Sequence, residues 1–221
     1  MNILINGSAI DFSLDGEKTA YEVVTAIKKE CEQRHAKIIG VELDGTVIDL
    51  IAYNGTEEEL DAISENPLKS AAVETVKELS VTTATLSDVI ELLKKRGEQS
   101  RELAQKAANL SVLLQSGKQQ EGLQFMCTLA DTVDAFCDAI KLTYLFDNAG
   151  ATSEKESASD TPPIEHLIGG KSKKDFFADF NAILNDFCDA QEKNDIVTLG
   201  DISEYEIQDR LLALSDYAQE L

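Results

Sequence analysis

The densest group of side chains that could carry out chemistry lies near the C-terminus, in residues 195–214, DIVTLGDISEYEIQDRLLAL. Clustered carboxylates can coordinate a cation or act as general acid and base. The stretch holds five carboxylates around one tyrosine: Asp195, Asp201, Glu204, Glu206 and Asp209. The chain has 41 Asp and Glu residues in total, so neighbouring carboxylates are weak evidence for a reaction.

A helical projection of this stretch, at about 100° per residue, separates its apolar face from its solvated one. The apolar face contains Ile196, Ile207, Leu211 and Leu214. Gly200 lies within that face, and its missing side chain predicts the close approach of a neighbouring helix. Asp195 is predicted to cap the helix N-terminus. Asp201, Glu204 and Asp209 point away from the apolar face and are interpreted as solvated charges.

Glu206 differs from the other carboxylates because it lies at the edge of the apolar face, with Arg210 one turn further along. An exposed i,i+4 pair of this kind contributes only about 0.2–0.5 kcal/mol to stability. A pair that is partly covered by another helix can instead set the register of that contact. We predict a structural Glu206–Arg210 pair at a helix interface. The alternatives are a partner-binding pair and a catalytic pair.

Three other sequence features were compared with phosphate-binding, calcium-binding and metal-binding motifs, and each lacks residues that the motif needs. Residues 169–172, Gly-Gly-Lys-Ser, lack the first glycine of a phosphate-binding GxxxxGK[ST] loop and predict a turn with Ser172 as N-cap. The acidic run Gly55–Asp61 lacks the alternating oxygens of a calcium loop. His35 and His166 have no partner at metal-ligand spacing. The sequence therefore predicts no catalytic, cofactor-binding or metal-binding residues.

Charge and cysteine content restrict the kinds of partner. Twenty basic against 41 acidic residues give a net charge of −21, which disfavours nucleic acids and anionic membranes. A basic protein partner remains compatible with this charge. The four cysteines, predicted to be buried reduced thiols, are scattered: Cys31, Cys127, Cys137 and Cys188. No signal peptide and no membrane-spanning run is found, so we expect a cytoplasmic protein.

Residues 1–83 predict strand, strand, helix, strand, strand, short acidic helix (residues 56–63) and strand. Asn6-Gly7 and Asp44-Gly45 are signals for tight hairpins, and Thr19 with Glu22 forms a capping box. Phe12 and Leu14 are expected to face a core with Ile10. This order of elements resembles the ubiquitin-like β-grasp fold. The resemblance implies one helix packed across a mixed sheet, but no particular activity.

Residues 84–221 change to helical periodicity and predict an antiparallel four-helix bundle. The first helix is expected over 86–116 with a bend at Gly97 and a C-cap at Gly117. A second helix (119–146), a flexible loop at about 147–163, a helix that begins at Ser172, and the acidic stretch complete the bundle. Its acidic helical character is similar in style to small bacterial export and flagellar chaperones.

The predicted fold class is thus α+β, an N-terminal β-grasp-like domain followed by a helical bundle. The leading functional hypothesis is a non-catalytic protein-interaction module, an adaptor, chaperone or regulator of a partner protein, without a cofactor. One alternative is a homodimeric structural scaffold. The other is an enzyme with a site between the two domains.

Overall fold

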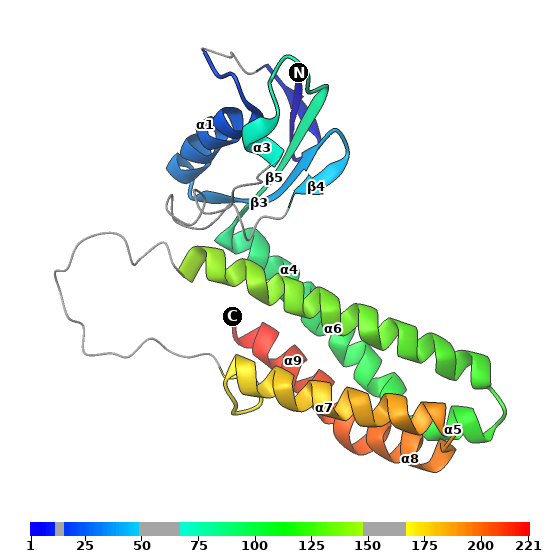
Figure 1. Ribbon diagram of the computed structural model, residues 1–221. Coiled ribbons are helices and arrows are strands. Elements are labelled where there is room, and N and C mark those ends of the chain that lie inside the picture. The colour runs from blue at the N-terminus through cyan, green and yellow to red at the C-terminus, as the bar shows by residue number, and fades with distance from the viewer. Residues whose placement is uncertain (12–15, 49–66, 148–166) are drawn as a thin grey trace, which may run out of the picture. The chain divides into compact units, whose positions relative to one another are not determined.

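The computed structural model describes residues 1–11, 16–48, 67–147 and 167–221 (Figure 1). Several expectations lie outside these residues: the inward-facing Phe12 and Leu14, the acidic run that includes residues 56–63, nearly all of the loop at about 147–163, and His166. The chain divides into two compact units. Met1–Val89 with Leu142–Thr152 form the first, and Ile90–Lys141 with Ser153–Leu221 form the second.

The first unit is built on a mixed five-stranded sheet. Its strands are β1 (Asn2–Ile5), β2 (Ser8–Ile10), β3 (Ala36–Leu43), β4 (Thr46–Ile48) and β5 (Glu78–Thr85). They lie in the order β2-β1-β5-β3-β4, with β1 and β5 parallel and the other neighbours antiparallel. Both two-residue turns have positive φ at each position, 50° and 76° at Asn6-Gly7 and 49° and 80° at Asp44-Gly45. Such primed turns match the twist of the strands, which is why these dipeptides predicted hairpins.

Helix α1 (Ala20–Gln33) packs its apolar stripe against this sheet. Val23, Val24 and Ile27 are buried in one cluster with Leu79 and Val81 of the central strand β5. The predicted capping box is present. The Thr19 hydroxyl accepts from the Glu22 backbone N–H, and the Glu22 carboxylate accepts from the Thr19 N–H. A short helix, α3 (Pro67–Ser70), contributes Leu68 to the same core.

We predict that Thr19→Ala lowers the free energy of unfolding by about 1 kcal/mol, because it leaves a helix N-terminal N–H without its acceptor. Thr25→Ala is the matched control, since the Thr25 hydroxyl only donates to the Tyr21 carbonyl within α1. Urea denaturation of both variants tests this. A loss at Thr25 equal to that at Thr19 would contradict the assigned role of the cap.

The second unit is helical and includes most of α4 (Leu86–Ala107) and α6 (Gln119–Asp147). Its other elements are α5 (Leu110–Gln115), α7 (Lys173–Glu192), α8 (Ile196–Asp201), the π-helical segment η2 (Ile202–Ile207) and α9 (Gln208–Glu220). Aromatic rings join these helices, with Phe125 of α6 against Phe187 of α7 and Phe136 of α6 against Tyr217 of α9. Within the residues that the structure describes, no helix is long and apolar enough to cross a membrane.

Two predicted helices differ from the observed ones. The helix expected over 86–116 is interrupted between α4 and α5, where the Asn109 side chain donates to the Gln105 carbonyl at 2.9 Å. Asparagine disrupts helices in this way because its amide competes for backbone groups. The acidic stretch was expected to be one regular helix, but a π turn divides it into α8 and α9. Gly117, with φ of 80°, follows the end of α5 as a C-cap glycine should.

The neighbours of Gly97, the position of the predicted bend, give it a packing role. It lies within α4, where a Cβ atom would come within 2.6 Å of the Ala218 Cβ and 3.3 Å of the Ser215 carbonyl oxygen. The glycine therefore lets α4 and α9 touch. On the next turn, the Arg101 guanidinium donates to the Ser215 hydroxyl at 3.0 Å and to the Asp216 carboxylate at 2.8 Å.

The prediction of buried thiols is wrong for two of the four cysteines. Cys31 is buried and Cys137 is half-buried, and burial raises the pKa of both thiols. Cys127 and Cys188 are exposed. They follow the buried Phe125 and Phe187 by two residues and one residue, which turns them away from the core side of their helices.

Candidate interaction surface

The chain from Asp195 to Glu220 forms the candidate site, and its first residue is a helix cap. The Asp195 carboxylate accepts from the Thr198 backbone N–H at 3.1 Å and from the Thr198 hydroxyl at 2.7 Å. The backbone hydrogen bond from Thr198 is the main cause that lowers the pKa of Asp195. This carboxylate is engaged in starting α8, as predicted, and is not free for chemistry.

The π turn of η2 brings a hydroxyl into contact with the end of α4. Ser203 is fully buried, and its hydroxyl donates to the Ala107 carbonyl at 3.0 Å. Ala107 is the last residue of α4, and carbonyls in a last helical turn lack partners within their own helix. A π turn is often found at functional positions. Here it lies opposite the break between α4 and α5.

Gly200 provides the second contact at this break. A Cβ atom at Gly200 would lie 2.6 Å from the Ser111 Cβ and 3.3 Å from the Ser111 Cα. The two contacts pair Ala107 with Ser203 and Ser111 with Gly200, so α5 and α8 run antiparallel. The structure thus places Gly200 at a helix contact that only a residue without a side chain allows.

Gly200→Ala should lower the free energy of unfolding by up to about 2 kcal/mol, because overpacking costs about 1–3 kcal/mol and helix propensity returns about 1 kcal/mol. In a Ser111→Gly background the same change should have a smaller effect, since the facing Cβ is then absent. A double-mutant cycle by urea denaturation measures both. Equal losses in the two backgrounds would show that Ser111 is not the obstacle.

Arg210 is held mainly by a residue that the sequence did not indicate. Its Nε and Nη2 atoms donate to one oxygen of Asp179, at 3.1 and 2.8 Å, and Lys171 donates to the same oxygen at 3.0 Å. The predicted partner, Glu206, is 3.7 Å from Arg210, which is longer than a hydrogen bond. Asp179 belongs to α7, so the observed pair joins α7 to α9 across the helix interface.

No local pattern could have identified Asp179. It lies beside the buried Phe180 on α7, 31 residues from Arg210 along the chain. The sequence shows a carboxylate at the edge of an apolar stripe, and many acidic residues of this chain fit that description. Only the packing of α7 on α9 selects it.

Hydrogen bonds from Lys171 and then from Arg210 lower the pKa of Asp179. A carboxylate with a lowered folded-state pKa stabilises the fold above its unfolded pKa of about 3.9, and this contribution is lost as the pH falls through the folded-state pKa. Asp179→Asn should therefore destabilise the protein at neutral pH, with a smaller effect below about pH 4. Glu206→Gln should have the smaller effect at neutral pH. Denaturation at several pH values tests this ranking, and the reverse order would contradict it.

Three large apolar side chains are exposed around the α5–α8 contact. Val112 of α5, Val197 of α8 and Tyr205 of η2 have 65%, 65% and 63% of their surface accessible. Val112 follows Ser111 by one residue, and Val197 precedes Gly200 by three residues. In antiparallel helices these displacements turn both side chains toward the same side of the contact.

Tyr205 continues the row of Val197. The two residues are eight positions apart, with the exposed Asp201 midway between them. A regular helix has 3.6 residues per turn and a π turn has more, so every fourth residue stays nearly in line through α8 and η2. We call the surface formed by Val112, Val197, Asp201 and Tyr205 the Tyr205 face.

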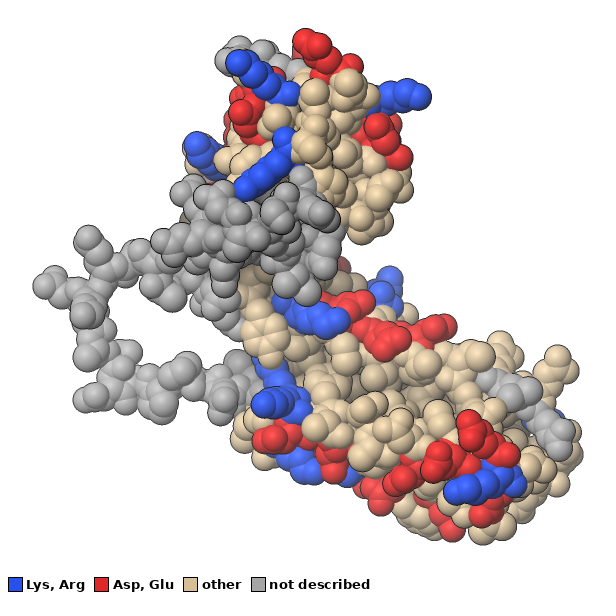
Figure 2. Space-filling view, viewed as in Figure 1, with Lys and Arg blue, Asp and Glu red and all other residues tan. Residues whose placement is uncertain are grey.

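The Tyr205 face lies in an acidic part of the molecule. Residues 195–220 contain seven Asp and Glu residues and one basic residue, Arg210. Arg210 is engaged by Asp179, which leaves Asp201, Glu206 and Asp209 exposed beside Tyr205. Acidic side chains are gathered at the end of the helical unit where α7 and α8 lie (Figure 2). The surface can therefore accept apolar groups that are flanked by positive charge.

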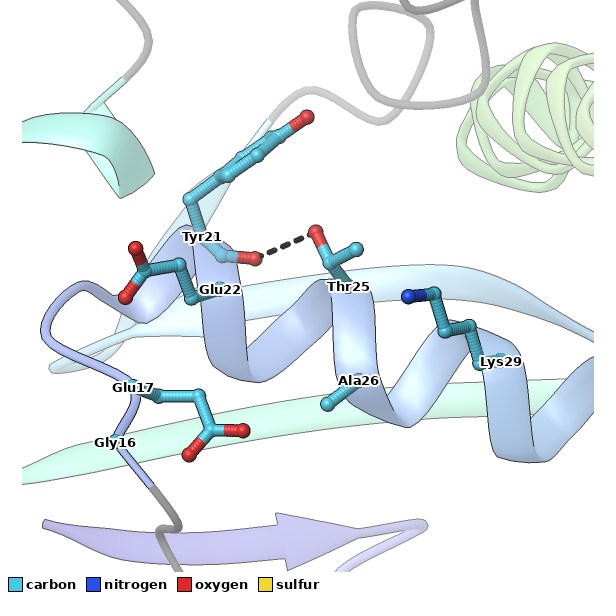
Figure 3. A pocket seen from close by; sticks show the side chains of 7 residues that line it. All are labelled: Gly16, Glu17, Tyr21, Glu22, Thr25, Ala26 and Lys29. Atoms are coloured by element: carbon cyan, nitrogen blue, oxygen red, sulfur yellow. Dashed lines mark hydrogen bonds between the residues drawn. The ribbon is translucent and has the colours of Figure 1, made fainter.

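The first unit has a hollow of about 410 Å³ beside α1, lined in part by Glu17, Tyr21 and Glu22 (Figure 3). The Glu22 carboxylate accepts from the Thr19 N–H in the helix cap, and the Thr25 hydroxyl donates to the Tyr21 carbonyl. These polar groups therefore stabilise α1 itself. One oxygen of Glu17 is buried without a hydrogen-bond partner among the described residues. Gly16 also lines the hollow, and it directly follows residues 12–15, which lie outside the described residues.

Metal-binding residues are not brought together in this part of the molecule. Across residues 1–11, 16–48, 67–147 and 167–221, no three His, Cys, Asp or Glu side chains are placed to hold a metal ion. His35 is exposed and has a φ of 55°, directly after the C-cap of α1. The Tyr205 face is an apolar surface bordered by carboxylates, and we take it as the candidate interaction surface.

These observations define an α+β protein with an N-terminal five-stranded sheet followed by helices. Residues 91–217 match the family described as a domain of unknown function (DUF8042), and the chain belongs to that family. Residues 1–85 match the family described as the TP0873 N-terminal domain. An uncharacterized protein of Treponema pallidum (strain Nichols) is 26% identical over 220 residues, which cover 98% of this chain and 95% of that protein. No solved structure matches the chain.

Proposed function

We propose that this protein is a non-catalytic protein-interaction module, and that its Tyr205 face binds a basic amphipathic segment of another protein. The observation that carries this proposal is the exposure of Val112, Val197 and Tyr205 on one side of the α5–α8 contact. Exposed apolar residues that lie together on a folded surface are typical of binding sites. Tyrosine is also enriched among the residues that dominate binding energies.

The acidic border selects the kind of partner. Asp201, Glu206 and Asp209 repel an acidic segment and attract a basic one, which speeds association and excludes wrong partners. An amphipathic helix with Lys or Arg beside its apolar side chains satisfies both the apolar and the charged parts of the surface. The net charge of −21 acts in the same direction over a longer range.

The homodimeric scaffold is the weaker alternative for the same reason. A two-fold dimer through the Tyr205 face would place this patch against its own copy. Asp201 and Asp209 would then approach carboxylates of the same sign, which is unfavourable. The enzyme with a site between the two domains stays a hypothesis.

We also propose a more specific description of the two units. The strand order β2-β1-β5-β3-β4 with parallel central neighbours and α1 against the sheet supports a ubiquitin-like β-grasp fold for the first unit. Contacts of α4 with α9, α9 with α7 and α7 with α6 support an antiparallel four-helix bundle for the second. The proposed partner is a helical segment, and binding of such a segment agrees with the similarity in style to export chaperones.

A synthetic amphipathic helical peptide of Lys and Leu tests the proposed function. We expect it to bind the full-length protein more weakly as salt is raised, because screening weakens the charge attraction. Tyr205→Ala should weaken binding about tenfold or more, as expected for a central aromatic contact. Fluorescence anisotropy of the labelled peptide measures both effects.

Two controls make this experiment specific to the Tyr205 face. Tyr144→Ala removes a tyrosine of α6 that is also about half exposed, and it should leave peptide binding unchanged. A Glu and Leu peptide of the same pattern should not bind. Equal losses at Tyr205 and Tyr144, or equal binding of both peptides, would contradict the proposal.

A further inference from the structure

A groove between α4 and α6 has a character that differs from the rest of this acidic protein. It encloses about 310 Å³, comparable with the lower end of small-molecule sites. Its lining includes two cations, Arg96 and Lys106, and two carboxylates, Glu102 and Asp131. The formal charge of the groove is therefore zero, in a chain whose net charge is −21.

The four charged side chains of the groove do not neutralise one another. Within the described part of the chain, Glu102, Lys106 and Asp131 form no ion pair. Arg96 donates through Nη1 to the Gln99 side-chain oxygen at 2.9 Å, and its Nε atom is buried without any hydrogen-bond partner. A buried donor left unpaired is unfavourable. Because Nε is covered by the protein itself, a ligand in the groove would meet the Arg96 guanidinium through its Nη atoms.

The α4 wall of the groove mainly presents hydrogen-bond donors. The Arg96 guanidinium and the Lys106 ammonium are donors only. The Gln99 oxygen already accepts from Arg96, and the amide nitrogen of Gln99 can donate into the groove. Glu102 is the exception on this wall. A carboxylate placed here would meet an Arg side chain, the residue best suited to bind carboxylates through paired N–H groups.

The α6 wall presents hydrogen-bond acceptors. The Thr128 hydroxyl donates to the Gln124 carbonyl at 2.8 Å, and the Thr132 hydroxyl donates to the Thr128 carbonyl at 2.7 Å. Each hydroxyl has used its proton within α6, so its oxygen can only accept. Asp131 lies between them in sequence and is an acceptor as a carboxylate. An ammonium group therefore suits this wall.

We infer that the groove between α4 and α6 binds a small zwitterion, an α-amino acid or a short peptide with free termini, with its carboxylate at Arg96 and its ammonium group at Asp131. The opposed walls match a molecule that carries both charges. A simple anion would leave the carboxylates of the groove without a partner, and a simple cation would leave Arg96 without one. Leu103, which is buried, contributes an apolar surface between the walls.

Nuclear magnetic resonance titration of the full-length protein tests this inference. The probes are L-alanine and L-alanyl-L-alanine, each at up to about 10 mM, which detects dissociation constants in the millimolar range. We expect backbone amide shifts at the groove residues of α4 and α6. N-acetyl-L-alanine lacks the ammonium group and L-alaninamide lacks the carboxylate, so both should bind about tenfold more weakly or worse. The stronger of the two zwitterions identifies the source as a free amino acid or a peptide.

Paired variants complete the test. Arg96→Gln and Asp131→Asn should each weaken zwitterion binding about tenfold or more, because each removes a charged hydrogen-bonding partner. Lys95→Gln and Asp134→Asn change the same charges at neighbouring exposed positions, and should bind like the unmodified protein. Asp131 is exposed, so Asp131→Asn remains informative if Arg96→Gln does not fold. No shifts with either zwitterion, or equal shifts with the blocked analogues, would overturn the inference.

Discussion

The helical unit depends on how closely α8 and η2 approach the break between α4 and α5. Gly200 permits that approach because any side chain would meet Ser111. The Ser203 hydroxyl then satisfies the Ala107 carbonyl at the end of α4. These contacts set the position of α8 and η2, and through them the position of Arg210 opposite Asp179 on α7. Close packing and a buried hydrogen bond act together at this point, so neither helix can shift without loss of the other's partners.

The same contact creates the exposed surface. Because Gly200 and Ser111 face inward, the residues beside them in each helix turn to the same side, where Val112, Val197 and Tyr205 are exposed. The π turn keeps Tyr205 in line with Val197. An apolar surface among carboxylates differs chemically from the neutral polar groove between α4 and α6. The helical unit therefore offers two separate kinds of recognition, one suited to a protein segment and one to a small charged molecule.

Local signals in the sequence predicted much of the secondary structure. Asn6-Gly7 and Asp44-Gly45 form the turns they are typical of, and Thr19 with Glu22 forms a capping box, because each depends on residues only a few positions apart. The predictions failed where a neighbouring element intervenes. The interruption at Asn109 replaced a continuous helix, and the approach of Ala218 gives Gly97 a packing role that the sequence did not indicate. Cys127 and Cys188 share helices with buried residues but lie on other faces.

By itself, the sequence determined the α+β class, the alternation of strands and helices, and Gly200 as a point of close approach. Hydrophobic periodicity and turn chemistry encode these features along the chain. The tertiary structure decided which carboxylate meets Arg210, since Asp179 becomes its neighbour only when α7 packs on α9. It also decided that Val112 and Tyr205 are exposed, and that donors of α4 and acceptors of α6 line one groove. Such pairings join residues far apart in sequence, so no local pattern specifies them.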